Sequence, residues 1–191
     1  MTHPLVADIE GYASVFNQPD LNGDVIAPGA FTLSLRAASA IRMLYQHAAE
    51  TPIGRWTAFR QDGHGLFVTG ELILSSPRAL EVHALLAGGA LDGLSIGYQT
   101  TRATKAPGGR KILEAELWEV SIVTFPMAPA ARITHVGAPR HEHSPQDYAA
   151  AFKESAAQTA GRAPSRPPTS PDAGARQFAD ALRSAAHKLS V

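Results

Sequence analysis

The chain has 191 residues, which suffices for one domain with a packed core and leaves little room for a second. Lys and Arg total 17 and so do Asp and Glu, so the zero net charge provides no global attraction to nucleic acid or anionic lipid. Cysteine is absent, which excludes disulfides, thiolate nucleophiles and cysteine-ligated metal sites. Because no apolar run has membrane-spanning length and the start lacks a signal peptide pattern, a soluble intracellular protein is expected.

Strands dominate the elements expected in the first 136 residues. Short apolar or alternating runs predict strands at 5–16, 41–45, 55–60, 66–74, 95–101, 111–125 and 132–136. Turn sequences at 61–65 and 106–109 predict hairpins, and helical spacing predicts helices at 30–40 and 76–87. In the second helix the expected shared face consists of Leu80, Val82, Leu85 and Leu86. The pattern indicates a mainly β fold with a few helices (α+β), in which an antiparallel sheet closes or folds on itself.

The composition changes after Val136. Residues 137–191 contain six of the 14 prolines and only three branched aliphatic side chains. Such a segment buries too little apolar area to offset the conformational entropy that it would lose on ordering. We therefore expect a folded domain at 1–136 and a flexible tail at 137–191, with short Ala-rich helical patches at 147–160 and 175–189.

The sequence Gly-Leu-Ser-Ile-Gly at 93–97 matches the G-x-S-x-G pattern of a nucleophile elbow. In that motif a strand precedes the serine and a helix follows it, whereas here the expected helix precedes Ser95 and a β-like run follows. From local sequence alone, the simpler interpretation is a strand that begins at a tight helix exit. The flanking glycines would still let another backbone or a substrate approach the Ser95 hydroxyl. A serine nucleophile also needs a neighbouring base, normally an imidazole.

Among the eight histidines, His47 has the most favourable position for that base. It ends an apolar run where a strand would emerge into a loop, and loops on a rigid scaffold commonly carry reacting groups. His64 at a hairpin tip is expected to be solvated, and His83 on a helix is expected to be structural. His141 and His143 form an H-x-H pair without an evident third ligand, so no metal site is expected.

Glu119 is a carboxylate inside a very apolar strand. A buried carboxylate needs a partner. Strand alternation would place Leu117, Glu119, Ser121 and Val123 on one face, and Trp118, Val120, Ile122 and Thr124 on the other. Two interpretations remain open: Glu119 pairs with an imidazole, or it occupies an outward position that faces water.

Six short motifs follow one another between residues 5 and 136. They are Gly-Tyr-Ala-Ser-Val-Phe-Asn at 11–17, Gly-Asp-Val-Ile-Ala-Pro-Gly-Ala-Phe at 23–31, Leu-Tyr-Gln-His at 44–47, Pro-Ile-Gly at 52–54, Gly-Leu-Ser-Ile-Gly-Tyr at 93–98 and Glu-Val-Ser-Ile-Val-Thr-Phe-Pro at 119–126. In this order they closely resemble the prohead protease family of tailed phages. The resemblance covers most of the expected domain, and the tail from Gly137 lies outside it.

The resemblance implies a serine endopeptidase that is packaged inside an immature capsid, within the cytoplasm of the bacterial host. Such an enzyme removes the scaffolding segment of the major capsid protein and commonly degrades itself. The chemistry needs no cofactor and no metal, and neither nucleic acid nor a membrane is an expected partner; a homo-oligomer is left open. The family is similar to herpesvirus assemblin, whose antiparallel β-barrel surrounded by helices agrees with the strand-rich pattern.

In the family pattern, His47 of the L-x-x-H element and Ser95 of the G-L-S-I-G element are the catalytic pair. Glu119 of the E-V-S element would be the third member, although assemblin uses a second histidine there, for which His83 is the rival candidate. His47 would take the Ser95 proton and return it to the leaving amine, while Glu119 would fix the imidazole tautomer. Backbone amides of the loop 127–132 are candidates for stabilising the oxyanion.

Two other functions compete with the endopeptidase. A non-catalytic scaffold or capsid assembly protein would retain the barrel and use the helical patches of the tail for assembly. An α/β-hydrolase esterase would require a parallel sheet and would hydrolyse small esters without any capsid. Cleavage of the capsid protein that depends on Ser95 and His47 distinguishes the endopeptidase from both.

Overall fold

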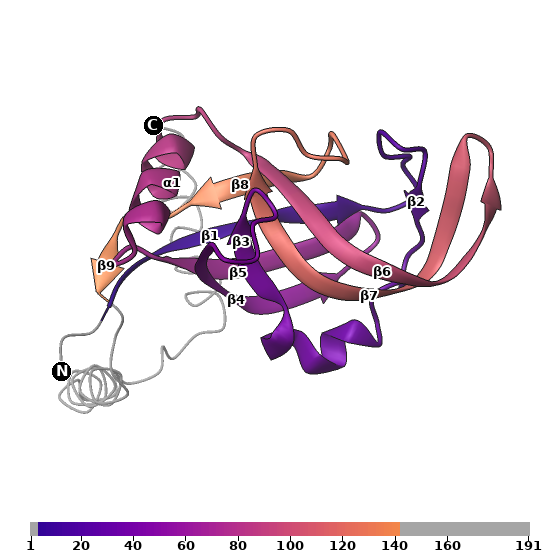
Figure 1. The fold of residues 1–191 in the computed structure, drawn as a ribbon, viewed down its shortest axis with the longest axis horizontal. Helices are drawn as coiled ribbons and strands as arrows, with labels where there is room; N and C mark the ends of the chain where they lie inside the picture. Colours follow the sequence, from indigo (N-terminus) through magenta and orange to yellow (C-terminus); the bar gives the residue numbers. More distant parts are fainter. Residues whose placement is uncertain (1–3, 142–191) are drawn as a thin grey trace, which may run out of the picture. The chain divides into compact units, whose positions relative to one another are not determined.

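A computed structural model describes residues 4–141 of the chain, and most of these residues lie in β-strands (Figure 1). The strands in chain order are β1 (Leu5–Val15), β2 (Val25–Ile26), β3 (Arg42–Tyr45), β4 (Pro52–Gln61), β5 (Gly65–Ile73), β6 (Gly93–Ala106), β7 (Gly109–Val123), β8 (Arg132–Val136) and β9 (Arg140–His141). The helical elements within these residues are the 3₁₀ segment η1 (Ser34–Ala40) and the α-helix α1 (Pro77–Ala87). Every strand predicted from the sequence is present, whereas the short strands β2 and β9 are additional.

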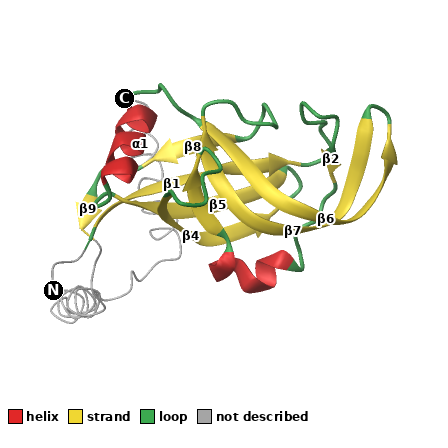
Figure 2. Ribbon diagram, in the orientation of Figure 1, coloured by secondary structure: helices red, strands yellow, loops and turns green. Residues whose placement is uncertain are grey.

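The strands close into a barrel, as Figure 2 shows. They pair in the order β7, β3, β4, β5, β1, β8 and β6, and β6 pairs back with β7. The short strands lie outside this ring, with β2 on β7 and β9 on β1. The contact that closes the ring between β8 and β6 is one residue pair, Arg132 with Gly93. The mainly β fold class and the barrel predicted from the sequence are thereby confirmed.

Two strand pairs depart from the antiparallel arrangement that the sequence predicts. Both β2 and β3 run parallel to β7, while the other pairs of described strands are antiparallel. No hairpin turn joins β3 to β7, so no local connection forces them to run in opposite directions. The parallel register places Tyr45, the last residue of β3, beside Ile122 of β7.

Apolar side chains fill the barrel. The largest fully buried ones, each at most 1% exposed, include Ile9, Phe31, Met43, Leu66, Leu94 and Ile122. Burying such a side chain contributes roughly 1.5–3 kcal/mol, so the interior is the main source of stability. Within it, the indole N–H of Trp56 donates a hydrogen bond of 3.2 Å to the Val120 carbonyl, which satisfies the buried donor.

The helix α1 buries Val82 and Leu86 of the predicted face but not its other two residues. Leu80 and Leu85 of the predicted face are 50% and 42% exposed. The buried residues are Ala79, Val82, His83 and Leu86. Their spacing is that of a single helical stripe, whereas the prediction placed every leucine inside. No helix within residues 4–141 combines the length and hydropathy that a membrane span requires.

The helix predicted at 30–40 is replaced by turns and the 3₁₀ segment η1. The start of this segment is bonded to β7, where the Ala30 carbonyl accepts the N–H of Ala115 at 2.9 Å. The Ser34 hydroxyl donates to the Ala115 carbonyl at 3.0 Å and accepts the N–H of Leu117 at 2.8 Å. These tertiary contacts override the local helix propensity.

A bulge at Trp118 changes the faces predicted for β7. Its two neighbours, Leu117 and Glu119, pair with consecutive residues of β6, so Trp118 is the extra residue. Leu117 therefore belongs to the core, where it is 4% exposed, instead of sharing the face of Glu119 as predicted. Trp118 is 53% exposed. Beyond the bulge the predicted alternation holds, and Glu119 and Ser121 share a face.

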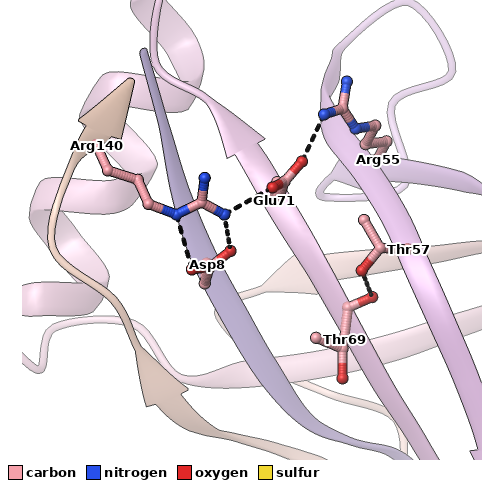
Figure 3. A network of polar contacts seen from close by, with 6 residues as sticks. All are labelled: Asp8, Arg55, Thr57, Thr69, Glu71 and Arg140. Atoms are coloured by element: carbon pink, nitrogen blue, oxygen red, sulfur yellow. Dashed lines mark hydrogen bonds and ion pairs between the residues drawn. The ribbon is translucent and has the colours of Figure 1, made fainter. Parts of the chain in front are cut away.

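A network of ion pairs ties β9 to the barrel, as the sticks of Figure 3 show. Arg140 on β9 contacts an oxygen of Asp8 at 2.7 Å and an oxygen of Glu71 at 2.8 Å. Arg55 on β4 contacts the other oxygen of Glu71 at 2.6 Å. Hydrogen bonds to these carboxylates raise the pKa of Arg140 above its ordinary value. The network thus links four strands through two carboxylates.

The sheet continues beyond residue 136, where the sequence predicts the domain to end. The N–H of Gly137 donates to the Asp8 carbonyl at 2.7 Å, and β9 then pairs with the start of β1. Arg140 supports this short pair through its contacts with Asp8 and Glu71. The helical patches predicted at 147–160 and 175–189 lie outside the described residues.

Candidate active site

His47 follows β3 in a sharp turn. Gln46 and His47 both have positive φ, 54° and 60°, which costs free energy for non-glycine residues and needs support from neighbours. The N–H of Gln46 donates to the Ile122 carbonyl at 3.0 Å, and its side-chain amide donates to the Thr124 hydroxyl at 2.7 Å. The N–H of His47 donates to the Ser121 hydroxyl at 3.1 Å. These bonds fix the turn to β7 and its C-terminal end.

The imidazole of His47 lies against the carboxylate of Glu119. Nδ1 and Oε1 are 2.7 Å apart, and the two side chains are 46% and 12% exposed. Because an ionised carboxylate only accepts hydrogen bonds, Nδ1 is the donor, and Nε2 is the ring nitrogen left to accept a proton. Of the two interpretations that the sequence leaves open for Glu119, the structure shows the pairing with an imidazole.

The second oxygen of Glu119 is held by Ser121. The Ser121 hydroxyl donates to Oε2 at 2.5 Å, and Ser121 is 0% exposed. A carboxylate removed from water requires hydrogen bonds to remain ionised at moderate cost. Both oxygens of Glu119 therefore have a partner, one from the turn after β3 and one from β7.

Ser95 lies on β6 directly opposite Ser121 of β7. Opposite residues of an antiparallel pair point to the same face, with Cβ atoms about 4.5–5.5 Å apart. Ser95 therefore shares the face that carries Ser121 and Glu119. Ser95 is 5% exposed, and its hydroxyl has no hydrogen-bond partner among residues 4–141. Such a hydroxyl can act as a nucleophile when its proton reaches a nearby imidazole.

The glycines of the 93–97 motif permit two close approaches. Gly97 lies opposite Glu119, and a Cβ on Gly97 would be 2.9 Å from Cδ and Cγ of the glutamate and would overlap Oε1. A Cβ on Gly93 would be 2.5 Å from the Val123 carbonyl. At Gly93 the close neighbour is therefore the backbone of the paired strand β7, and at Gly97 it is the carboxylate that holds His47. The predicted approach to the Ser95 hydroxyl itself stays a prediction.

The family comparison covers this whole site. Residues 4–147 match the family model described as "Caudovirus prohead serine protease". This match spans more than half of the chain and includes His47, Ser95 and Glu119. The chain belongs to this family. The family resemblance drawn from the sequence motifs is thereby confirmed.

Two curated relatives of this prohead protease family member are phage proteins. The chain is 38% identical over 130 residues to the prohead protease of Enterobacteria phage HK97, which covers 65% of this chain and 57% of that protein. It is 32% identical over 136 residues to the capsid polyprotein of Pseudomonas phage PAJU2, which covers 67% of this chain and 20% of that protein. The chain thus spans less than two thirds of the length of either relative.

Solved structures of herpesvirus proteases are also similar to this chain. The protease of Kaposi's sarcoma-associated herpesvirus (KSHV) is 17% identical with a TM-score of 0.48, over 80% of this chain and 77% of that chain. Varicella-zoster virus protease is 16% identical with a TM-score of 0.46, over 70% of this chain and 64% of that chain.

His83, the rival candidate for the third position, has a different partner. It lies on α1, is 9% exposed, and its Nε2 is 3.0 Å from the carbonyl of Gly137. Among the described residues, no hydrogen bond or ion pair joins it to His47 or Ser95. The contact with Gly137 fits the structural role that the sequence predicts for His83, whereas Glu119 is the residue that contacts His47.

The loop after β7 lies beside the strand that carries Ser95. The carbonyl of Ala131 accepts the N–H of Leu94 at 3.1 Å. A cavity of about 50 Å³ includes both Ser95 and Met127 in its lining. The loop 127–132, predicted to contain oxyanion donors, is therefore close to the serine. A larger cavity of about 800 Å³ between η1 and β7 is lined by none of the three predicted site residues.

The described residues offer no site for a metal cluster. Between residues 4 and 141, no group of three or more His, Asp or Glu side chains is placed to hold an ion. Of the H-x-H pair, His141 is described and His143 lies outside the described residues.

Sequence reasoning places Ser121 on the face of Glu119 but assigns it no role. The available signal is a second polar side chain, close after Glu119, in a strand that is otherwise apolar. The turn at Gln46 and His47 has no comparable signal, because non-glycine residues rarely take positive φ. Its hydrogen bond to Ser121 depends on the parallel pairing of β3 with β7, which no local pattern predicts.

Proposed function

We propose that this chain is a serine endopeptidase of capsid maturation, which cleaves the scaffolding segment of a major capsid protein and also cleaves itself. Membership of the prohead serine protease family supports the reaction class. The relative from phage PAJU2 is a capsid polyprotein, which supports a capsid protein as partner. The cleavage would take place inside the immature capsid, in the cytoplasm of the bacterial host. The observation that carries the proposal is the His47–Glu119 hydrogen bond on the face of Ser95.

In the proposed reaction, the Ser95 hydroxyl adds to the scissile carbonyl while its proton passes to Nε2 of His47. The imidazolium then donates this proton to the leaving amine, and an acyl-enzyme remains on Ser95. Water, deprotonated by the same imidazole, hydrolyses the ester and restores the serine. Glu119 keeps the proton of the resting imidazole on Nδ1, so that Nε2 is free to accept, and it stabilises the imidazolium.

The oxyanion formed on the substrate needs hydrogen-bond donors. Removal of one such donor commonly costs about 2.7–4 kcal/mol of transition-state stabilisation. The loop 127–132 lies close to Ser95, as the bond between Leu94 and Ala131 and the shared cavity lining indicate. We therefore assign the oxyanion donors to backbone amides of this loop, other than Pro129, which has no N–H, and Ala131, whose N–H donates to the Ala128 carbonyl.

The proposal is tested by coexpressing the full chain with its cognate major capsid protein. The unaltered chain should shorten the capsid subunit, and its own mass should fall during assembly. Ser95→Ala and His47→Ala should leave the subunit at full length, with cleavage rates at least about 10³-fold lower, because each removes a partner in proton transfer. Mass spectrometry of assembled particles measures both products.

Two exposed residues provide matched controls for these variants. Ser75→Ala and His135→Ala remove the same side chains from positions exposed to solvent, and they should leave cleavage unchanged. Cleavage by the Ser95→Ala variant would contradict the mechanism. Particles that assemble with full-length capsid protein around the unaltered chain would contradict the endopeptidase and favour a non-catalytic assembly factor.

A further inference from the structure

The Ser121 hydroxyl bridges the two residues that the proposed mechanism requires to act together. It donates to Oε2 of Glu119 at 2.5 Å and accepts the backbone N–H of His47 at 3.1 Å. A hydroxyl has one donor and two acceptor positions, so the donor of Ser121 is committed to Glu119. Ser121 is 0% exposed, and water therefore cannot replace these bonds without rearrangement of the site.

The turn held by this hydroxyl is strained. Gln46 and His47 both have positive φ, so the backbone remains in this conformation only where surrounding contacts hold it. The N–H of His47 is anchored by Ser121, and that of Gln46 by the Ile122 carbonyl. Loss of the Ser121 hydroxyl would free the half of the turn that carries the imidazole.

The carboxylate is restrained by the same hydroxyl. With Oε2 held by Ser121, the carboxylate presents Oε1 to Nδ1 of His47, at 2.7 Å. Gly97 leaves the space in which this orientation fits. The Ser121 side chain thus fixes the position of the Glu119 carboxylate relative to the backbone N–H of His47.

We propose that Ser121 is a positioning residue that holds His47 and Glu119 in register, so that Nε2 faces the Ser95 hydroxyl. The inference rests on the proposed endopeptidase function. Ser121 transfers no proton to substrate and takes no part in covalent chemistry. Its effect is on the geometry of the reacting groups, where a displacement of about 1 Å can lower a rate about 100-fold.

The chain contains a matched control, Ser34 of η1, whose hydroxyl bonds to the strand that carries Ser121. Ser34 also uses its hydroxyl twice, as a donor to the Ala115 carbonyl and as an acceptor for the N–H of Leu117. Both serines therefore lose one donated and one accepted bond when replaced by alanine. Only Ser121 makes these bonds to His47 and Glu119.

The test compares Ser121→Ala with Ser34→Ala in the full chain, by cleavage of a peptide that spans the capsid processing site. Ser121→Ala should lower kcat roughly 10- to 100-fold with little change in KM, because substrate contacts remain while the reacting groups are misaligned. Ser34→Ala should keep kcat and lower Tm by about as much as Ser121→Ala. Ser121→Thr, which retains a hydroxyl, should recover most of kcat.

A spectroscopic measurement keeps this inference separate from the proposed function. In proton NMR spectra, the Nδ1 proton of His47 should be protected in the unaltered chain and in Ser34→Ala, and should exchange rapidly with water in Ser121→Ala. An unchanged kcat and a protected proton in Ser121→Ala would overturn the positioning role and leave the endopeptidase intact. If the unaltered chain cleaves no capsid peptide, the proposed function fails, while the Nδ1 proton still reports on Ser121.

Discussion

The cluster around His47 and the cluster around Arg140 both join strands of the barrel through carboxylates. At the Arg140 end, one guanidinium contacts Asp8 and Glu71, and Arg55 contacts the remaining oxygen of Glu71. At the His47 end, Glu119 has partners on both oxygens as well, namely the imidazole and the Ser121 hydroxyl. The two clusters are therefore alike in that both oxygens of Glu71 and both oxygens of Glu119 have partners.

They differ in what lies next to the bonded groups. The Arg140 cluster pairs permanently charged guanidinium groups with carboxylates on regular strands, and arginine does not release its proton near neutral pH. The His47 cluster contains a group that accepts and releases protons, a strained turn at Gln46 and His47, and the Ser95 hydroxyl, which has no hydrogen-bond partner within residues 4–141. A network in which fixed positive charges contact the carboxylate oxygens supports the fold. A carboxylate whose two oxygens are both bonded, and which lies beside a titratable ring and the Ser95 hydroxyl, is arranged for proton transfer.

This comparison predicts its largest effect at Gly97. Gly97→Ala would place a methyl group on the carboxylate of Glu119, which must then leave its bonds with His47 and Ser121. We expect kcat to fall about 100-fold, because the imidazole loses the partner that orients it. Steady-state cleavage of a capsid peptide measures kcat, and circular dichroism melts report whether the barrel remains folded.

Gly63→Ala is the matched control for that substitution. Gly63 lies in the hairpin between β4 and β5, and a Cβ there would meet no atom within 4 Å. Activity should be unchanged. If Gly97→Ala cleaves as fast as Gly63→Ala, the contact between Gly97 and Glu119 has no part in catalysis and the contrast between the clusters is lost.

A smaller effect, on stability alone, is expected at the other cluster. Arg140→Gln removes the charge that pairs with Asp8 and Glu71 and that anchors β9. Because these groups are partly exposed, we expect a loss of about 1 kcal/mol, or a Tm lower by about 2–4 °C. Urea unfolding should show the loss, while kcat should remain at the unaltered value. A lower kcat with unchanged unfolding would reverse the roles assigned to the two clusters.

The parts of the fold that follow local periodicity could be predicted from the sequence. The apolar alternation of 5–16 corresponds to β1, and the run 111–125 to β7. The strands β2 and β9 could not, because two residues are too few to show a period. The helix predicted at 30–40 is replaced by turns and a 3₁₀ segment, where the Ala30 carbonyl and the Ser34 hydroxyl bond to β7, and local propensity contains no sign of these contacts.

The site was predictable to a similar degree. Glu119 is conspicuous as a carboxylate in an apolar strand, and His47 and Ser95 belong to motifs that resemble the family. The role of Ser121 depends on two long-range pairings, of β3 with β7 and of β6 with β7. Register between distant strands is set by the packed barrel as a whole, so no local pattern contains it.

The smallest effect is predicted at another ion pair, Asp24 with Arg110, in which a guanidinium group also contacts both oxygens of a carboxylate. The guanidinium of Arg110 donates to both oxygens of Asp24, at 3.0 Å and 2.5 Å, and Asp24 is 8% exposed. The hydrogen bonds from Arg110 hold the pKa of Asp24 below its ordinary value, although burial opposes them. A carboxyl whose pKa is lowered by folding stabilises the folded state only while it is ionised.

This contribution should be complete above about pH 4, the ordinary range of an aspartate, and should disappear as the pH falls through the lower pKa of the folded state. Asp24→Asn should therefore be less stable than the unaltered chain at pH 7, by about 1 kcal/mol or less, and the difference should shrink below about pH 4. Urea unfolding of both proteins between pH 7 and 2.5 measures this difference, in which the other carboxyls cancel. If the difference in unfolding free energy stays constant over this range, Asp24 stabilises the fold through packing. Its pair with Arg110 would then differ from the ion pairs of Arg140, which act through charge.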